Sequence, residues 1–302
     1  MSYNWSWHIE WQTPYEFHAH GITNVFFDKQ TDFQRIMLAN LHRFGKTLII
    51  DGKIQSSVED EYIYHESLVH PLLLSLNEPK EVLILGGGEG ATLREVLKHR
   101  YVRKAVMVDI DSTVIDVARN YMKEWHAGAF EDPRTELVIG DGYDYVKKSS
   151  EVFDAVVLDL TDPMRESTSY KLYTKEFYEI LSSKVRDGGG IVTQATSPSF
   201  SLEVFSVINN TCRVVFGNSH PYITYIPAFD GLWGFVASIK GGGSIIKSEK
   251  VDEEVKERIV GELKHYDGPT HASMFNIPKG LRRILNFEKK VSTESNPVVV
   301  PA

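Results

Sequence analysis

Short apolar runs alternate with amphipathic stretches along most of the chain from residue 81 onward. The apolar runs read EVLILG, AVMVDI, LVIG, AVVLDL and GGIVTQ, and each is followed by residues whose apolar positions recur at helical spacing. Uninterrupted short apolar runs are typical of strands that are buried on both faces of a sheet. The pattern therefore predicts an α/β domain with a parallel, doubly wound sheet and helices on both of its faces.

The two ends of the chain follow other patterns. Near the start, FQRIMLAN, TLIID and KIQSS read as strands, and Asp51-Gly52 is typical of a type I′ hairpin turn. Near the end, YITYIPAF and WGFVASI are expected to pair antiparallel and complete the main sheet, and VDEEVKERIVGELKHY is expected to be a helix. We expect a small N-terminal all-β domain over 1–60, an α/β domain over 61–288 and a flexible tail over 289–302.

The stretch that joins the two domains reads DEYIYHESLVHPLLLS. Its acidic first turn and its apolar spacing predict a helix, which Pro71 is expected to kink or interrupt.

A glycine-rich turn follows the first strand of the α/β domain. The sequence GGGEGA, which includes Gly86 and Gly88, satisfies G-x-G-x-x-G/A between a strand and a helix, and this context predicts a Rossmann-like nucleotide or nucleoside site. Glu89 would lie beside the phosphates of a dinucleotide, which argues against NAD. A sulfonium nucleoside such as S-adenosylmethionine has no phosphate, and the same carboxylate would attract its cationic side chain.

Further carboxylates follow the next two strands. Asp109 ends the second strand, where an acidic residue typically accepts hydrogen bonds from ribose hydroxyls. Asp111 is better interpreted as a helix N-cap. Asp141 and Gly142 end the third strand, where the carboxylate could accept a hydrogen bond from the adenine amino group or could only form a turn.

The fourth strand ends in DLTDP, which places Asp159 and Asp162 just beyond the edge of the sheet where ligands bind in such folds. So many carboxylates at one edge predict a cationic substrate. An amine has a pKa of about 10 and must lose a proton before it can act as a nucleophile. Crowded like charges raise the pKa of a carboxylate, so Asp159 is predicted to be the base. A cap or turn role is the alternative for Asp162.

Composition excludes several partners. The 302 residues carry 33 Lys plus Arg against 41 Asp plus Glu, a net charge of −8, with no basic block, so nucleic acid is not an expected partner. Neither a secretory signal nor a membrane span is apparent, and we expect a cytoplasmic protein without a membrane partner. The single cysteine, Cys212, is expected to be a buried apolar residue. His18-x-His20 lacks an evident third ligand, so no metal is expected, and Trp5, Trp7 and Trp11 are expected in packing or subunit contacts.

The motifs GGGEGATLREVLKH, DIDSTVIDVAR, GDGYDYV and DLTDP, preceded by DGKIQSSVEDEYIYHESLVHP, closely resemble the polyamine aminopropyltransferases of the spermidine and thermospermine synthase type. The resemblance covers about residues 34–278. It implies transfer of the aminopropyl group of decarboxylated S-adenosylmethionine to an amine, release of 5′-methylthioadenosine, no prosthetic group, and a homodimer or homotetramer. The roles it implies are nucleoside binding by Gln34, Asp109, Asp141 and Gly142, donor amine binding by Glu89, proton acceptance by Asp159, and acceptor contacts from Tyr64, His65, Asp162 and Gln194.

Two departures from the family pattern concern the acceptor. Phe229 and Asp230 replace a Tyr-containing TYPSG-like stretch, so the preferred acceptor among putrescine, agmatine, spermidine and longer amines stays open, with Asp230 a candidate ligand for a longer polyamine. After Asp162-Pro163, MRESTSY replaces a Gly-rich loop.

An S-adenosylmethionine-dependent methyltransferase, which shares the expected sheet, is the alternative enzyme. It is the weaker interpretation because DLTDP lacks the Asn/Asp-Pro-Pro-aromatic signature of many amino methyltransferases. A polyamine-binding or nucleoside-binding sensor without turnover is the non-enzymatic alternative.

Overall fold

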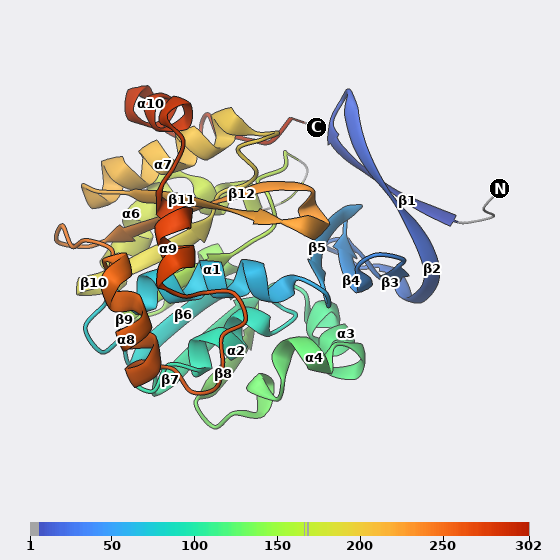
Figure 1. Cartoon of the computed structure of the whole chain (residues 1–302), viewed down its shortest axis with the longest axis horizontal. Coiled ribbons are helices and arrows are strands. Elements are labelled where there is room, and N and C mark those ends of the chain that lie inside the picture. The colour runs from blue at the N-terminus through green and yellow to red at the C-terminus, as the bar shows by residue number, and fades with distance from the viewer. Residues whose placement is uncertain (1–5, 166, 168, 302) are drawn as a thin grey trace.

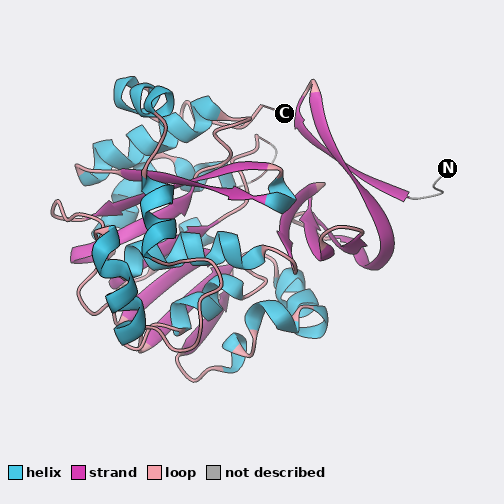
Figure 2. Cartoon of the chain, viewed as in Figure 1, coloured by secondary structure: helices cyan, strands magenta, loops and turns pink. Residues whose placement is uncertain are grey.

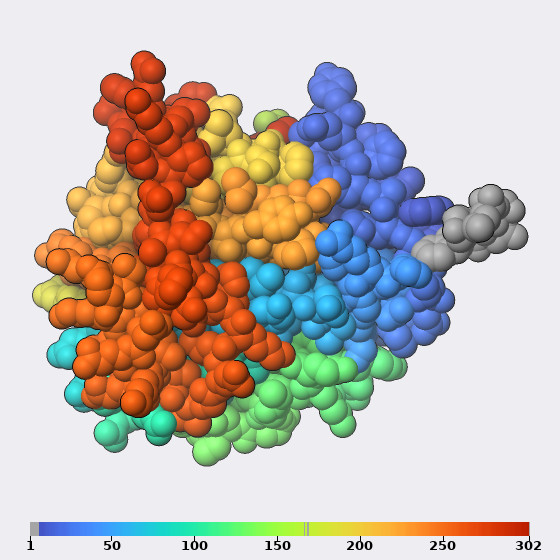
Figure 3. All heavy atoms as spheres, in the orientation of Figure 1, coloured from blue at the N-terminus to red at the C-terminus, as the bar shows by residue number. Residues whose placement is uncertain are grey.

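The computed structural model describes residues 6–165, 167 and 169–301. Trp5 and two residues of the MRESTSY stretch lie outside the described residues. Two sheets are present, and the smaller N-terminal one (blue) lies beside the larger α/β domain (Figure 1). The space-filling view shows the two in direct contact (Figure 3).

The N-terminal sheet is antiparallel, with its strands in chain order. It consists of β1 (Ser6–Thr13), β2 (Glu16–Gln30), β3 (Arg35–Leu41), β4 (Gly45–Ile50) and β5 (Lys53–Ser57). The last three are the strands that the sequence predicted. Asp51 and Gly52 both have positive φ, 49° and 79°, which confirms the type I′ turn between β4 and β5. The long hairpin β1–β2 was not located from the sequence.

The main sheet has seven strands in the order β11-β12-β10-β9-β6-β7-β8. Their bounds are β6 (Glu81–Gly86), β7 (Lys104–Asp109), β8 (Thr135–Ile139), β9 (Phe153–Asp159), β10 (Val185–Gln194), β11 (His220–Ile226) and β12 (Gly231–Ile239). The five strands from β10 to β8 are parallel, whereas β12 is antiparallel to both β10 and β11. Both predictions, the parallel sheet and the antiparallel pair that completes it, are confirmed.

Helices cover both faces of this sheet (Figure 2). Successive strand residues alternate between two hydrophobic cores, so that Val82 and Ile84 pack on one face and Leu83 and Leu85 on the other. The first face is covered by α1 (Glu61–Leu73), α2 (Ala91–Leu97), α3 (Ser112–Tyr121), α8 (Ser248–Arg258) and α9 (Gly268–Phe275). The second is covered by α5 (Gly142–Lys148), α6 (Lys175–Ser183), α7 (Leu202–Phe216) and α10 (Lys279–Phe287). Short connecting turns are α4 (Lys123–His126), η1 (Ala129–Glu131), η2 (Ser169–Tyr173) and η3 (Pro227–Phe229).

Two local expectations differ from the structure at least in part. Helix α1 is not interrupted at Pro71, and the carbonyl of Ser67, which a proline cannot bond, accepts the hydroxyl of Tyr222 at 2.9 Å instead. The helix expected over 251–266 ends at Arg258. Beyond it, the Glu66 carboxylate accepts the backbone N–H groups of residues 264–266, which holds that stretch in a non-helical path.

The last residues do not form the free tail that the sequence suggested. The Ser292 N–H donates to Thr211 on α7 at 3.0 Å, and the Val300 N–H donates to the Pro163 carbonyl at 2.9 Å. Val298 and Val300 pack against the core beside α7. The apolar run near the end of the chain therefore covers part of the α/β domain. Within the described residues, no helix is long and apolar enough to cross a bilayer.

Candidate active site

The predicted site residues lie in a row along the edge where the parallel strands end. The strand order places Asp141 after β8, Asp109 at the end of β7, the glycine loop after β6, Asp159 at the end of β9, and Gln194 at the end of β10. The chain runs from β6 outward to β7 and β8, and later from β9 outward to β10 on the other side. The switch point of the sheet, where such folds bind ligands, therefore lies between the glycine loop and Asp159.

The glycine loop fits closely between two of these aspartates. A Cβ atom on Gly86, whose φ is +81°, would lie 2.1 Å from the backbone oxygen of Asp159. A Cβ on Gly88 would lie 2.7 Å from a carboxylate oxygen of Asp109. Only glycine fits this path between β7 and β9, which explains the motif without any ligand.

A cavity of about 350 Å³ opens over this row. Its lining includes all but two of the residues that were predicted to act in catalysis or substrate binding: Gln34, Tyr64, Gly86, Gly88, Glu89, Asp109, Asp141, Gly142, Asp159, Asp162, Gln194 and Phe229. The two that the lining does not include are His65 and Asp230. The N-terminal domain also contributes, since Glu10, Gln12 and Lys53 line the same cavity.

Asp159 is buried at the centre of the row and is held from two sides. The Tyr64 hydroxyl donates to its Oδ1 at 2.7 Å, and the Thr92 hydroxyl donates to its Oδ2 at 2.6 Å. Burial, reinforced by the negative charge of Glu89, raises the pKa of Asp159 to about 6. A carboxylate in this position is ionised at neutral pH and is basic enough to accept a proton.

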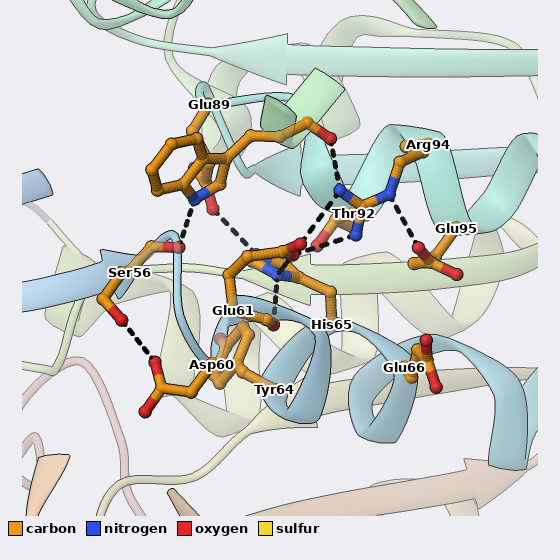
Figure 4. A network of polar contacts seen from close by, with 12 residues as sticks. Ser56, Asp60, Glu61, Tyr64, His65, Glu66, Glu89, Thr92, Arg94 and Glu95 are labelled. Carbon is orange, nitrogen blue, oxygen red and sulfur yellow. Dashed lines mark hydrogen bonds and ion pairs between the residues drawn. The ribbon is translucent and has the colours of Figure 1, made fainter. Parts of the chain in front are cut away.

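His65 lies beneath Glu89 and not in the cavity, which corrects its predicted contact with the acceptor. Its Nε2 is 2.9 Å from Glu89 Oε1, and its Nδ1 is 2.9 Å from Glu61 Oε2 (Figure 4). Burial alone would lower the pKa of His65, but the hydrogen bonds and charges of the two carboxylates raise it to about 10. His65 is therefore an imidazolium that donates from both nitrogens and fixes the Glu89 carboxylate at the cavity wall.

The chain of contacts continues away from the cavity through Glu61. Arg94 Nη2 is 2.9 Å from Glu61 Oε2, and Arg94 Nε is 2.7 Å from Glu95 (Figure 4). Ligand atoms of His65, Glu89 and Asp159 lie within 4.8 Å of one another, close enough for a metal site. Both His65 nitrogens face carboxylates and carry protons, however, so this histidine has no lone pair to offer a metal in this arrangement.

The carboxylates on the β7 and β8 side lie beside backbone N–H groups. Burial raises the pKa of Asp109 to about 7, although its Oδ1 accepts the backbone N–H of Asp111 at 2.9 Å. Asp111 accepts the Thr113 N–H, which confirms its interpretation as the N-cap of α3. Asp141 caps α5 by accepting the Asp144 N–H at 3.1 Å and also lines the cavity, so both of its possible roles are compatible with its position.

The β9 and β10 side contains an acidic group that the sequence did not reveal. Burial raises the pKa of Asp162 to about 6, and Gln194 donates to this carboxylate at 3.3 Å. Glu10 on β1 is 7% exposed, accepts the Ile54 N–H at 3.2 Å, and has a pKa that burial raises to about 7. A possible signal was the alternation in SWHIEWQT, where Glu10 faces inward between the outward-facing Ile9 and Trp11.

Asp230 does not reach the cavity, which removes the basis for its predicted acceptor role. It adopts a left-handed conformation with φ 49° at the end of η3, and its side chain is 57% exposed. Its carboxylate instead lies 3.4 Å from His18 Nε2 on β2. The neighbouring Phe229 does line the cavity, where its ring packs against Trp233, another residue that the sequence did not reveal.

Comparisons with known proteins identify the family of this chain. Residues 61–248 match the spermine/spermidine synthase domain, and residues 6–57 match the spermidine synthase tetramerisation domain. The chain is 60% identical to a polyamine aminopropyltransferase of Sulfurisphaera tokodaii and 54% identical to that of Sulfolobus acidocaldarius, in each case over 99% of this chain and all of the relative.

Solved structures give the same result. A crystal structure of spermidine synthase in complex with the transition state analogue AdoDATO superimposes with a TM-score of 0.88 at 31% identity, over 95% of this chain and 97% of that one. Spermidine synthase from Thermotoga maritima superimposes with a TM-score of 0.85 at 30% identity, over 95% and 96%. The chain belongs to the spermine/spermidine synthase family and is a polyamine aminopropyltransferase.

Proposed function

We propose that the acceptor is a linear aliphatic amine with at least one further cationic group, the class that includes putrescine, agmatine and spermidine. The observation that carries the proposal is a second pair of carboxylates in the cavity, the half-buried Asp162 and the buried Glu10, on the far side of Asp159 from the glycine loop. Lys53 supplies one positive charge near these two carboxylates, so a monoamine would leave the pair short of a second cationic partner.

The donor is assigned to the β6–β8 side of the cavity. Asp109 would accept from the ribose hydroxyls, Asp141 would accept from the adenine amino group, and Gln34 would line the nucleoside site from the N-terminal domain. Glu89, fixed by the His65 imidazolium, would bind the ammonium of the aminopropyl group. This arrangement would direct the aminopropyl carbon that is bonded to sulfur toward Asp159.

The acceptor is assigned to the β9–β10 side of the cavity. The rings of Tyr64, Phe229 and Trp233 offer apolar walls for a methylene chain, and the Phe229 and Trp233 centroids are 4.7 Å apart. Asp162 and Glu10 would then bind the cationic group at the far end of the acceptor. Asp230, which does not line the cavity and lies beside His18, has no part in this assignment.

The proposed reaction is a direct displacement. Asp159 takes a proton from the acceptor ammonium. The nitrogen lone pair then forms a bond to the aminopropyl methylene carbon that is attached to sulfur. The carbon–sulfur bond breaks with both electrons going to sulfur, which leaves neutral 5′-methylthioadenosine. Holding the two reactants at attack distance can contribute about 7 to 11 kcal/mol to lowering the barrier.

The test is product analysis with decarboxylated S-adenosylmethionine and amines of matched length. Putrescine, agmatine and spermidine should each give a new amine and an equal amount of methylthioadenosine, whereas butylamine, which lacks the second charge, should react poorly. Equal turnover of butylamine and putrescine would contradict the proposed acceptor class. Methyl transfer from intact S-adenosylmethionine would instead support the methyltransferase alternative.

We also propose that the outer face of the β1–β2 hairpin forms the subunit contact. Ile9, Trp11 and Phe17 are each about half exposed on this face, and the Trp11 and Phe17 rings touch edge to face. Introducing a negative charge by Trp11→Glu should lower the mass measured by light scattering. An unchanged mass would exclude this face as the contact.

A further inference from the structure

The acceptor side of the cavity contains a fixed cation. Most charged side chains that line the cavity are acidic, and the lysines among the described lining residues are Lys53 and Lys171. Lys53 is the first residue of β5, directly after the turn at Asp51-Gly52. A cation inside a cavity that receives cationic substrates needs an explanation, because it repels the molecules that the site binds.

The position of Lys53 is fixed by a backbone contact. Its Nζ donates to the carbonyl oxygen of Trp11 on β1, the residue next to Glu10. The ammonium group is therefore anchored at the strand that brings Glu10 into the cavity. The contact also ties β1 to the β4–β5 hairpin, so Lys53 contributes to the shape of this wall.

The charge of Lys53 reaches both carboxylates of the acceptor side. It lowers the pKa of Glu10 and of Asp162, and thereby opposes the larger effect of burial on each. The negative charge of Asp162 in turn raises the pKa of Glu10. Glu10, Asp162 and Lys53 are thus one electrostatic group, in which the lysine already supplies one of the positive charges that the two carboxylates favour.

We propose that Lys53 is a specificity-determining residue whose ammonium takes the place of the outermost cation of a longer polyamine, so that acceptors with fewer positive charges are preferred. This inference rests on the acceptor assignment proposed above. An acceptor that extends past Asp162 toward Glu10 brings its next ammonium close to Lys53 and meets repulsion. Discrimination then comes from a repulsive group as much as from an attractive one.

The test compares acceptors of increasing charge in variants of Lys53. Lys53→Met keeps much of the side-chain length but removes the charge, and it should raise the ratio of kcat/KM for spermine over putrescine by about tenfold. Lys53→Arg keeps the charge and should leave the ratio near that of the wild type. Lys171→Met is the matched control, because Lys171 lines the same cavity from η2 while the pKa effects on Glu10 and Asp162 trace to Lys53.

A purely structural role would give another result. If Lys53 only supports the wall, Lys53→Met should lower kcat/KM for all acceptors by the same factor and leave the ratio unchanged, which would overturn the inference. If that variant does not fold, as judged by thermal unfolding, Lys53→Gln gives the same comparison with a side chain that can still donate to the Trp11 carbonyl. Adding Glu10→Gln to either variant should cancel the change in ratio, because the carboxylate that attracts the extra ammonium is then gone.

The two proposals fail in distinguishable ways. A wild-type enzyme that uses butylamine as well as putrescine contradicts the acceptor assignment, whatever the Lys53 variants do. A wild-type enzyme that requires the second charge, combined with a Lys53→Met variant of unchanged acceptor ratio, overturns the role of Lys53 alone.

Discussion

The two sides of the cavity are built in different ways. On the β6–β8 side, Asp109, Asp141 and the glycine loop all follow strands of one sheet within a continuous stretch of the chain. On the β9–β10 side, Asp162 and Gln194 follow strands of the same sheet, but Glu10 and Lys53 come from the N-terminal domain. Apart from Gln34, the residues assigned to the nucleoside side follow strands of the main sheet, whereas the amine side takes two charged residues from the N-terminal domain. The amine side therefore depends more strongly on how the two domains meet.

This difference suggests a division of roles. The nucleoside is the same for every acceptor, so its side can be built from a fixed motif in which Gly86 and Gly88 admit no side chain. The acceptor is the variable substrate, and the second domain supplies residues that can change without disturbing the sheet. Substitutions on the two sides should consequently affect different kinetic constants.

The largest effect is expected at the boundary between the two sides. Asp159→Asn removes the proton acceptor while its contacts with Tyr64 and Thr92 can be kept in part, so kcat should fall by about a hundredfold to ten-thousandfold. The KM for the donor should change little. Steady-state kinetics with methylthioadenosine detection measures both constants.

The control for this variant is Asp187→Asn, since the Asp187 side chain is 95% exposed and outside the cavity. It should behave as the wild type. A kcat for Asp159→Asn near that of the wild type would remove Asp159 from the role of base.

The next effect isolates the nucleoside side. Asp109→Asn keeps the size of the side chain but replaces one acceptor oxygen by a donor, so one ribose hydroxyl loses its partner. The KM for the donor should rise by about tenfold to a hundredfold, while the KM for the amine stays constant. An equal rise in both constants would show that the two sides are coupled, contrary to the comparison above.

The nucleoside side was also the more predictable from the sequence. The strand-loop-helix context of GGGEGA and the aspartates at the ends of short apolar runs are local patterns. The regular alternation of these runs with helical stretches predicted the parallel sheet itself. Local patterns also gave Asp159 and Asp162, because both follow the same strand. Each of these residues lines the cavity in the structure.

Part of the amine side escaped prediction for a physical reason. Glu10 lies on a strand that was not located from the sequence, and it enters the cavity through packing between domains. His65 follows Tyr64 directly on α1, so the sequence placed it beside the cavity but could not show that it faces Glu61 and Glu89 instead. The sequence also could not show that Asp230 has a left-handed backbone and that its carboxylate lies beside His18 and not in the acceptor site.

A smaller effect isolates the amine side. Glu10→Gln keeps the acceptor of the Ile54 N–H but removes a negative charge from a buried position. The KM for spermidine should rise by about tenfold, as expected for the loss of one partly desolvated ion pair, with the KM for the donor unchanged. Gln12→Glu would be expected to act in the opposite direction, because Gln12 lines the same wall. A rise in donor KM with Glu10→Gln would place Glu10 on the wrong side of the cavity.

The smallest effect near neutrality is expected from pH, and it tests whether Asp159 belongs to both sides. Its pKa of about 6 in the free enzyme means that the base is ionised above pH 6 and becomes protonated as the pH falls. The kcat/KM for the donor, which reports on free enzyme, should therefore fall as the pH is lowered through 6, and the fall should begin near pH 7 because the pKa of the donor ligand Asp109 is raised to about 7. Bound sulfonium and ammonium groups stabilise the carboxylate, so the acidic limb of kcat should lie at lower pH than that of kcat/KM. If the acidic limbs of kcat and kcat/KM lie at the same pH, the bound substrates do not stabilise the Asp159 carboxylate. The division of the cavity into two sides that meet at this residue would then have to be abandoned.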